Sequence, residues 1–136
     1  MVQVVADTSA LADYILGAEN MEVVAAVLEH PATRLHIPHL GDAEMASVLG
    51  SRMRRNEMDE ERLVEALTDY QDLPLRRHAQ HRLMGRALEL RENFSAYDAM
   101  YVALAEQLEA SLLTTDARLG RAITTLTSVP LATARR

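Results

Sequence analysis

The sequence predicts a single α/β domain built on a mainly parallel sheet. Short apolar runs typical of strands alternate along the chain with longer stretches in which apolar residues recur at helical spacing. The run at residues 2–6 is apolar at nearly every position, as expected of a strand that is buried on both faces. Such alternation is typical of a parallel sheet with helices on both faces. With 136 residues, no linker and no internal repeat, the chain is expected to form one domain over residues 1–136.

The N-terminal half is expected to contain two strands and four helices. Gly17 ends the first helix, Pro31 closes the second, and Pro38 ends the second strand. The third helix follows from the spacing of its apolar residues, and the fourth begins with an acidic first turn. The expected strands are 2–6 and 34–37, and the expected helices are 8–16, 21–30, 40–54 and 59–71.

The C-terminal half is expected to continue the same alternation. Pro74 lacks a backbone donor, so the strand that contains it is expected at an edge of the sheet. The helices again follow from the spacing of apolar residues. The expected strands are 73–77 and 111–115, with 129–133 as a fifth strand if it also pairs, and the expected helices are 77–92, 96–109 and 117–123.

The composition excludes several classes of protein. Cysteine is absent, which rules out disulfides, thiolate metal sites and cysteine nucleophiles. No apolar run reaches the roughly 18 residues of a membrane span, and the N-terminus lacks the layout of a signal peptide, so a cytoplasmic protein is expected. Dinucleotide-binding, P-loop and acyl-transfer motifs are missing. All 14 basic residues are arginines, which suit phosphate, but the net charge of −6 is not typical of a nucleic-acid binder.

Four acidic residues are the strongest functional signal. Asp7 and Asp116 each follow a short apolar run and precede a helix. Ligands of open α/β sheets bind outside the carboxyl ends of the strands, so these two side chains are expected to share one crevice. Glu44 and Asp98 lie on the edges of apolar helix stripes and are expected to face the same crevice. Four carboxylates together predict a site for a hard divalent cation, which prefers oxygen ligands.

Each of these acids also has a structural explanation. Asp7 and Asp116 can cap the helices that follow them, and Ser95 with Asp98 fits a capping box. Glu44 can favour the positive end of its helix dipole. Capping alone does not require acids on partly apolar faces, where a carboxylate is costly unless it is paired or bound to a metal. The combination therefore favours a shared metal site.

Histidines and arginines give weaker signals. Two pairs of histidines are spaced three residues apart, His36 with His39 and His78 with His81. Neither pair has a third nitrogen or sulfur ligand in register, so ordinary histidines are expected in place of a zinc site. Two arginine-rich stretches are expected to be solvated faces, with RNA-phosphate contacts as the alternative. They comprise Arg52, Arg54 and Arg55, and Arg76, Arg77, Arg82 and Arg86.

Three segments resemble the PIN domain, specifically the VapC-type toxins of toxin–antitoxin pairs. They are VVADTSALADYIL, IPHLGDAEMASVL and FSAYDAMYVALAEQLEASLLTTDARL, in the right order and spacing. The resemblance implies a PIN-like three-layer α/β/α fold with four or five parallel strands. It further implies an Mg²⁺- or Mn²⁺-dependent endoribonuclease that cleaves RNA, is restrained by a small VapB-like antitoxin and forms a homodimer.

The resemblance assigns the acidic quartet to Asp7, Glu44, Asp98 and Asp116. Ser9 and Thr115 match polar positions that support the quartet. Asp42 lies two residues before Glu44, and the helical direction favours Glu44 as the acid that points inward. Asp7 and Asp98 are expected to be direct metal ligands, and the other two acids to bind directly or through water.

Two other functions compete with the ribonuclease. A phosphatase with an aspartyl nucleophile also places an aspartate after the first strand, but it needs a second aspartate two residues later, where Ser9 stands. A catalytically silent PIN-like module that binds RNA or protein is disfavoured because all four acids are present. The RNA target and the acid that acts as general base are left open by the sequence.

Overall fold

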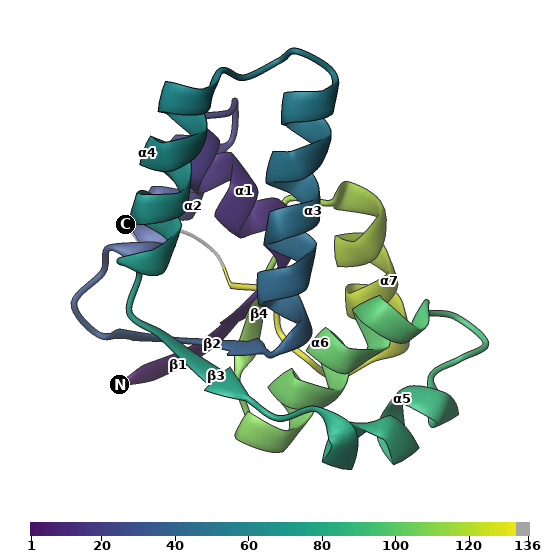
Figure 1. Ribbon diagram of the computed structural model, residues 1–136. Helices are drawn as coiled ribbons and strands as arrows, with labels where there is room; N and C mark the ends of the chain where they lie inside the picture. The colour runs from purple at the N-terminus through teal and green to yellow at the C-terminus, as the bar shows by residue number, and fades with distance from the viewer. Residues whose placement is uncertain (133–136) are drawn as a thin grey trace.

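The computed structural model describes residues 1–132 and places a four-stranded sheet between two layers of helices (Figure 1). All neighbouring strands are parallel, and their order across the sheet is β3-β2-β1-β4. The strands are β1 (Val2–Ala6), β2 (Thr33–Pro38), β3 (Leu75–His78) and β4 (Ser111–Leu113). The predicted three-layer architecture is confirmed, with four strands.

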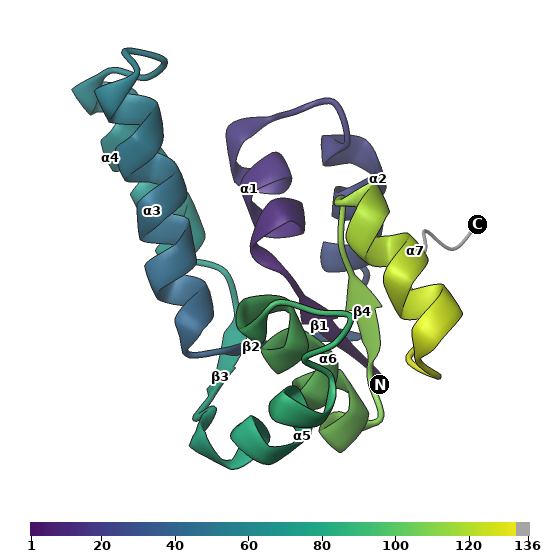
Figure 2. The ribbon, with the colours of Figure 1, turned by 90° about the vertical axis from the view of Figure 1, so that its right-hand side faces the viewer.

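The helices divide between the two faces of the sheet according to which core they help to build. Figures 1 and 2 show the first four helices on one side of the sheet, with α5 and α6 on the other. The first layer contains α1 (Thr8–Leu16), α2 (Met21–Leu28), α3 (Leu40–Arg54) and α4 (Glu60–Gln71). The second contains the 3₁₀ turn η1 (His81–Leu83), α5 (Met84–Glu89), α6 (Ala96–Leu108) and α7 (Ala117–Leu126). Among the described residues, no helix is long and apolar enough to cross a membrane.

Strand β1 lies in the middle of this arrangement and explains the apolar N-terminal run. Val4 and Ala6 pack into the core beneath α1 to α4, while Val5 packs into the core that α6 and α7 share. All three side chains are buried, because successive residues of a strand point to opposite faces. A strand covered on both faces therefore needs apolar residues at consecutive positions.

Two predicted elements differ in the structure. The edge strand predicted at 73–77 is confirmed as β3, with slightly different bounds. The helix predicted at 77–92 is wrong in its first part, because residues 75–78 pair with β2 as a strand and helical turns begin only at His81. Pairing with the free edge of β2 satisfies backbone groups that local helical spacing does not take into account. The fifth strand predicted at 129–133 is reduced to a single parallel bridge between Leu131 and Leu112, and residue 133 lies outside the described part.

Candidate active site

The carboxyl ends of β1 and β4 bring two of the predicted acids to the same edge of the sheet. Asp7 directly follows β1, and its backbone N–H donates to the carbonyl of Leu113, the last residue of β4, at 3.0 Å. Asp116 follows β4 after two threonines and begins α7. Because β1 and β4 are parallel neighbours, 109 positions of sequence separation do not keep the two acids apart.

Asp7 is a buried carboxylate fixed by three donors. Its side chain is 5% exposed. One oxygen accepts from the backbone N–H of Ala10 at 3.0 Å and from the Ser9 hydroxyl at 2.7 Å, while the other accepts from the Thr114 hydroxyl. Burial raises the pKa of Asp7 above its usual value of 3.8, the hydrogen bonds lower it in part, and the charge of Asp98 raises it further. Asp7 caps α1, yet its environment also concentrates negative charge.

The polar residues around Asp7 form a network that joins α1 to the loop after β4. The Ser9 hydroxyl accepts from the Thr115 backbone N–H at 3.1 Å, and the Thr114 hydroxyl accepts from the Asp116 backbone N–H at 3.1 Å. Ser9 therefore joins Asp7 to the loop after β4. Thr115 contributes its backbone to the network, and the threonine hydroxyl that reaches Asp7 belongs to Thr114, which sequence reasoning passed over.

Glu44 is held between three helices. Its Oε1 accepts from the Tyr101 hydroxyl of α6 at 2.6 Å and from the Thr8 hydroxyl of α1 at 3.0 Å. Burial, and then the hydrogen bond to Glu44, raises the pKa of Tyr101, so its hydroxyl stays protonated and donates. Gly41 makes this approach possible, since a Cβ there would lie 3.2 Å from both the Tyr101 hydroxyl and Ile37 Cδ1. Thr8 and Tyr101 were not predicted, although Tyr101 lies one turn after Asp98.

Asp98 lies in the first turn of α6, but it is not the residue that caps that helix. Ser95 is the N-cap, and its hydroxyl accepts from the Asp98 backbone N–H at 3.1 Å. Burial, and then the charge of Asp116, raises the pKa of Asp98 above 3.8. The capping explanation therefore accounts for Ser95 and leaves the carboxylate of Asp98 available for another role.

Asp116 combines capping with a free oxygen. Its Oδ1 accepts from the backbone N–H groups of Arg118 at 3.0 Å and Leu119 at 3.2 Å, as an N-cap does. Within residues 1–132, its Oδ2 accepts no hydrogen bond. Capping uses one of the two oxygens, and the other remains able to bind a ligand.

Asp42 belongs to a different network from Glu44. It accepts from the Arg77 guanidinium at 2.7 and 3.0 Å and from the Tyr70 hydroxyl at 2.8 Å, which ties α3 to β3 and α4. The hydrogen bond from Arg77 lowers the pKa of Asp42 below 3.8. Asp42 is thus paired with Arg77 at a partly exposed position, whereas Glu44 faces α1 and α6.

Charge links the three aspartates in turn, and Glu44 is linked to them only through Tyr101. Asp98 acts on the pKa of Asp7, Asp116 acts on that of Asp98, and both Glu44 and Asp7 act on that of Tyr101. Within residues 1–132, no three acidic or histidine side chains converge closely enough to hold an ion together. Mg²⁺ keeps several of its waters and binds proteins through one or two carboxylates. The chemical type of these side chains, carboxylates that lie some distance apart, therefore fits Mg²⁺.

Comparison with known proteins assigns the family. Residues 4–123 match the model of the PIN domain. The VapC ribonuclease Mb0985 of Mycobacterium bovis is 38% identical over 130 residues, which cover 93% of this chain and 98% of that protein. Ribonuclease VapC3 of Mycobacterium tuberculosis is 37% identical over 121 residues, covering 88% and 87%. The crystal structure of Mycobacterium tuberculosis VapC20, a Sarcin-Ricin loop cleaving toxin, shares the fold with a TM-score of 0.68 at 16% identity, covering 88% of this chain and 94% of that one. The chain belongs to the PIN-domain family, and its relatives within that family are VapC ribonucleases.

Proposed function

We propose that this protein is an Mg²⁺- or Mn²⁺-dependent endoribonuclease and the toxin of a VapBC-type toxin–antitoxin pair. The observation that carries the proposal is the charge-coupled set of aspartates at the N-termini of α1, α6 and α7, with Glu44 held beside them. Likeness to VapC ribonucleases supports the choice of RNA as the substrate. The catalytic residues of the proposal are Asp7, Glu44, Asp98 and Asp116.

The metal is proposed to bind at the aspartates. Asp7 and Asp98 would hold it directly, and Glu44 and Asp116 directly or through water. A divalent ion bound there lowers the pKa of a coordinated water and stabilises negative charge on the scissile phosphate.

The protein's own residues prepare the site for this chemistry. Three donors fix the Asp7 carboxylate, so it need not reorganise during the reaction. Thr8 and Tyr101 hold one oxygen of Glu44, which leaves its other oxygen to orient a water molecule. The N-termini of α1, α6 and α7 carry partial positive charge and backbone N–H groups, and helix N-termini of this kind favour phosphate.

A small antitoxin is the proposed protein partner, and a homodimer the proposed assembly. The family relationship to VapC ribonucleases supports the first of these. The outer surface of α4 supplies an apolar area for such a partner, because Val64 and Leu67 are exposed on it. Copurification with the product of a neighbouring small reading frame checks the antitoxin, and light scattering checks the dimer.

The purified chain, freed of any partner, is expected to cleave structured RNA in Mg²⁺ or Mn²⁺ and to stop when EDTA is added. The expectation follows from oxygen ligands that act on phosphate only through a bound cation. Cleavage is followed on denaturing gels with labelled RNA. Undiminished cleavage in excess chelator contradicts the metal mechanism. Hydrolysis of a phosphate monoester without RNA cleavage favours an aspartate-dependent phosphatase.

A further inference from the structure

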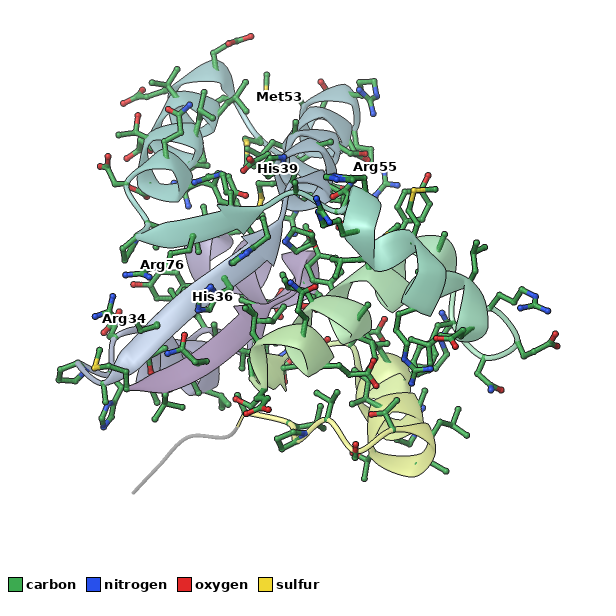
Figure 3. All side chains as sticks on the ribbon, turned by 90° about the horizontal axis from the view of Figure 1, so that it is seen from below. Arg34, His36, His39, Met53, Arg55 and Arg76 are labelled. Atoms are coloured by element: carbon green, nitrogen blue, oxygen red, sulfur yellow. The ribbon has the colours of Figure 1, made fainter. Side chains whose placement is uncertain are left out.

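A group of arginines and histidines lies on the sheet, away from the four acids. The group, called here the β2–β3 strip, consists of Arg34, His36, His39, Arg76 and His78. Leu35, Ile37 and Leu75 of the same strands pack toward α1 to α4, so Arg34, His36, Arg76 and His78, which alternate with them, face the opposite side. His39 follows the last residue of β2 and precedes α3. Figure 3 shows Arg34, His36 and Arg76 along the two strands, with His39 at the end of β2.

The two arginines of the strip lie on adjacent strands and on the same face of the sheet, and within residues 1–132 they are not neutralised as Arg77 and Arg86 are. Arg77 pairs with Asp42 at 2.7 Å, and Arg86 pairs with Glu106 at 2.7 Å. Within residues 1–132, Arg34 and Arg76 form neither a salt bridge nor a side-chain hydrogen bond. In a protein of net charge −6, this leaves a local excess of positive charge at one edge of the sheet.

Two histidines of the strip, His36 and His78, contact each other across neighbouring strands. His36 is 5% exposed, and its Nδ1 lies 2.9 Å from Nε2 of His78, while its Nε2 contacts the amide oxygen of Gln3. Because the Gln3 oxygen can only accept, Nε2 of neutral His36 carries the hydrogen and Nδ1 accepts from His78. Both ring nitrogens of His36 are thus used in joining β1, β2 and β3. The pair is a structural connection between neighbouring strands.

The charged groups that shift the pKa values of these two histidines are basic. Burial, and then His78, Arg76 and Arg34, lower the pKa of His36. Burial, and then His39 and Arg76, lower the pKa of His78. Every charged neighbour that acts on the two rings is basic. The strip therefore suits an anion supplied from outside the chain.

We propose that the β2–β3 strip binds the phosphate backbone of a single-stranded segment of the RNA substrate. Arg34 and Arg76 project from adjacent strands on the same face, and guanidinium forks bind phosphate with two parallel hydrogen bonds. The exposed ring of His39 is available to stack on a base. RNA is favoured over an acidic peptide because this inference rests on the proposed ribonuclease function.

The strip also leads toward the acidic residues. β2 is parallel to β1, so its carboxyl end lies at the same edge of the sheet as Asp7. His39 lies at that end, with its backbone N–H bonded to the His78 carbonyl at 2.9 Å, and α3 with Glu44 begins at the next residue. An RNA strand bound along the strip is thereby directed toward the four acidic residues.

Fluorescence anisotropy with a labelled single-stranded RNA tests the strip, using the full chain in EDTA so that no cleavage occurs. The test variant is Arg34→Gln/Arg76→Gln. The control is Arg52→Gln/Arg91→Gln, which makes the same change in charge at exposed residues whose ion pairs are weak, 3.9 and 4.0 Å. Each phosphate contact contributes about 0.7 to the salt slope of single-strand binding, so losing two lowers the slope by about 1.4 and weakens binding about 25-fold at 0.1 M salt.

The outcomes separate the strip from the proposed function. A test variant that binds like the control overturns the strip, even if RNA cleavage in Mg²⁺ is intact. A wild type that binds through the strip but cleaves no RNA overturns the ribonuclease and leaves the strip standing. Two results assign the strip to a protein contact and overturn the proposal. One is that polyglutamate competes as well as unlabelled RNA, and the other is that a dimer is lost only in the test variant. If the double variant fails to fold by circular dichroism, Arg76→Gln alone is expected to weaken binding about fivefold.

Discussion

Asp7→Asn is expected to abolish RNA cleavage while leaving the fold intact. Asparagine keeps an oxygen that accepts from the Ala10 backbone N–H, and it is as good an N-cap as aspartate. It removes the negative charge that the proposed metal site needs. Loss of groups that merely support metal ligands typically costs about 10–100-fold, so loss of a ligand is expected to cost at least about 100-fold. Gel assays with labelled RNA measure the rate, and circular dichroism checks the fold.

The same substitution is expected to relieve growth arrest in cells that express the chain alone. The harm of a ribonuclease toxin is catalytic, so a stable but inactive protein does not stop growth. Asp42→Asn is the matched control, since Asp42 lies near Glu44 in sequence but is bound to Arg77 and Tyr70. The control is expected to retain both cleavage and arrest. Arrest that persists with a stable Asp7→Asn protein indicates toxicity through binding and contradicts the catalytic account.

Asp98→Asn is expected to raise, or leave unchanged, the stability of the metal-free protein at pH 7. Burial and the charge of Asp116 raise the folded-state pKa of Asp98 above 3.8. A carboxyl group with a raised folded pKa favours folding when it is protonated, and this contribution is lost as the pH rises from about 3.8 through the folded pKa. At pH 7 the charged form therefore works against folding, and asparagine removes that effect. Below pH 3.8 the difference between variant and wild type is expected to vanish.

Urea denaturation in EDTA at pH 7 and at pH 3.5 measures this effect, as long as the wild type remains folded at the lower pH. Ser95→Ala serves as the control because Ser95 is the N-cap of α6, and losing a cap is expected to cost about 1 kcal/mol. Added Mg²⁺ is expected to stabilise wild type by mass action and Asp98→Asn less. The metal site is contradicted if Asp98→Asn is destabilised about as much as Ser95→Ala and neither wild type nor variant responds to Mg²⁺. That result shows that Asp98 has a structural role.

The sequence predicted those parts of the fold that depend on local pattern. The apolar run at 2–6 marked a strand buried on both faces, and the aspartates after two such runs lie at the same edge of the sheet, as their positions predicted. Pro74 correctly marked the edge strand that is β3, but its boundary with the next helix was harder, because local spacing suits a helix from Arg77 onward while pairing with β2 continues the strand to His78. Long-range pairing decides such segments, and a single sequence does not display it.

The hydrogen bonds that support the candidate site could not be predicted from the local sequence pattern either. Thr114 and Thr115 are adjacent and chemically identical, and only the twist of the chain after β4 decides which hydroxyl reaches Asp7. The ring of Tyr101 packs in the apolar core of α6, and apolar spacing does not reveal that its hydroxyl reaches Glu44. Sequence spacing sets His36 near His39 and His78 near His81, but the ring contact in the structure joins His36 to His78, and this proximity follows from the register of β2 and β3.

Direct titration with Mn²⁺ tests the central claim, that Asp7 and Asp98 bind a divalent ion within the four-acid site. Calorimetry is carried out on wild type, Asp7→Asn, Asp98→Asn and the control Asp42→Asn, each verified as folded. Wild type and Asp42→Asn are expected to bind Mn²⁺ equally, and the two site variants at least about tenfold more weakly. Absence of Mn²⁺ binding by wild type, or equal binding by all four proteins, contradicts the account.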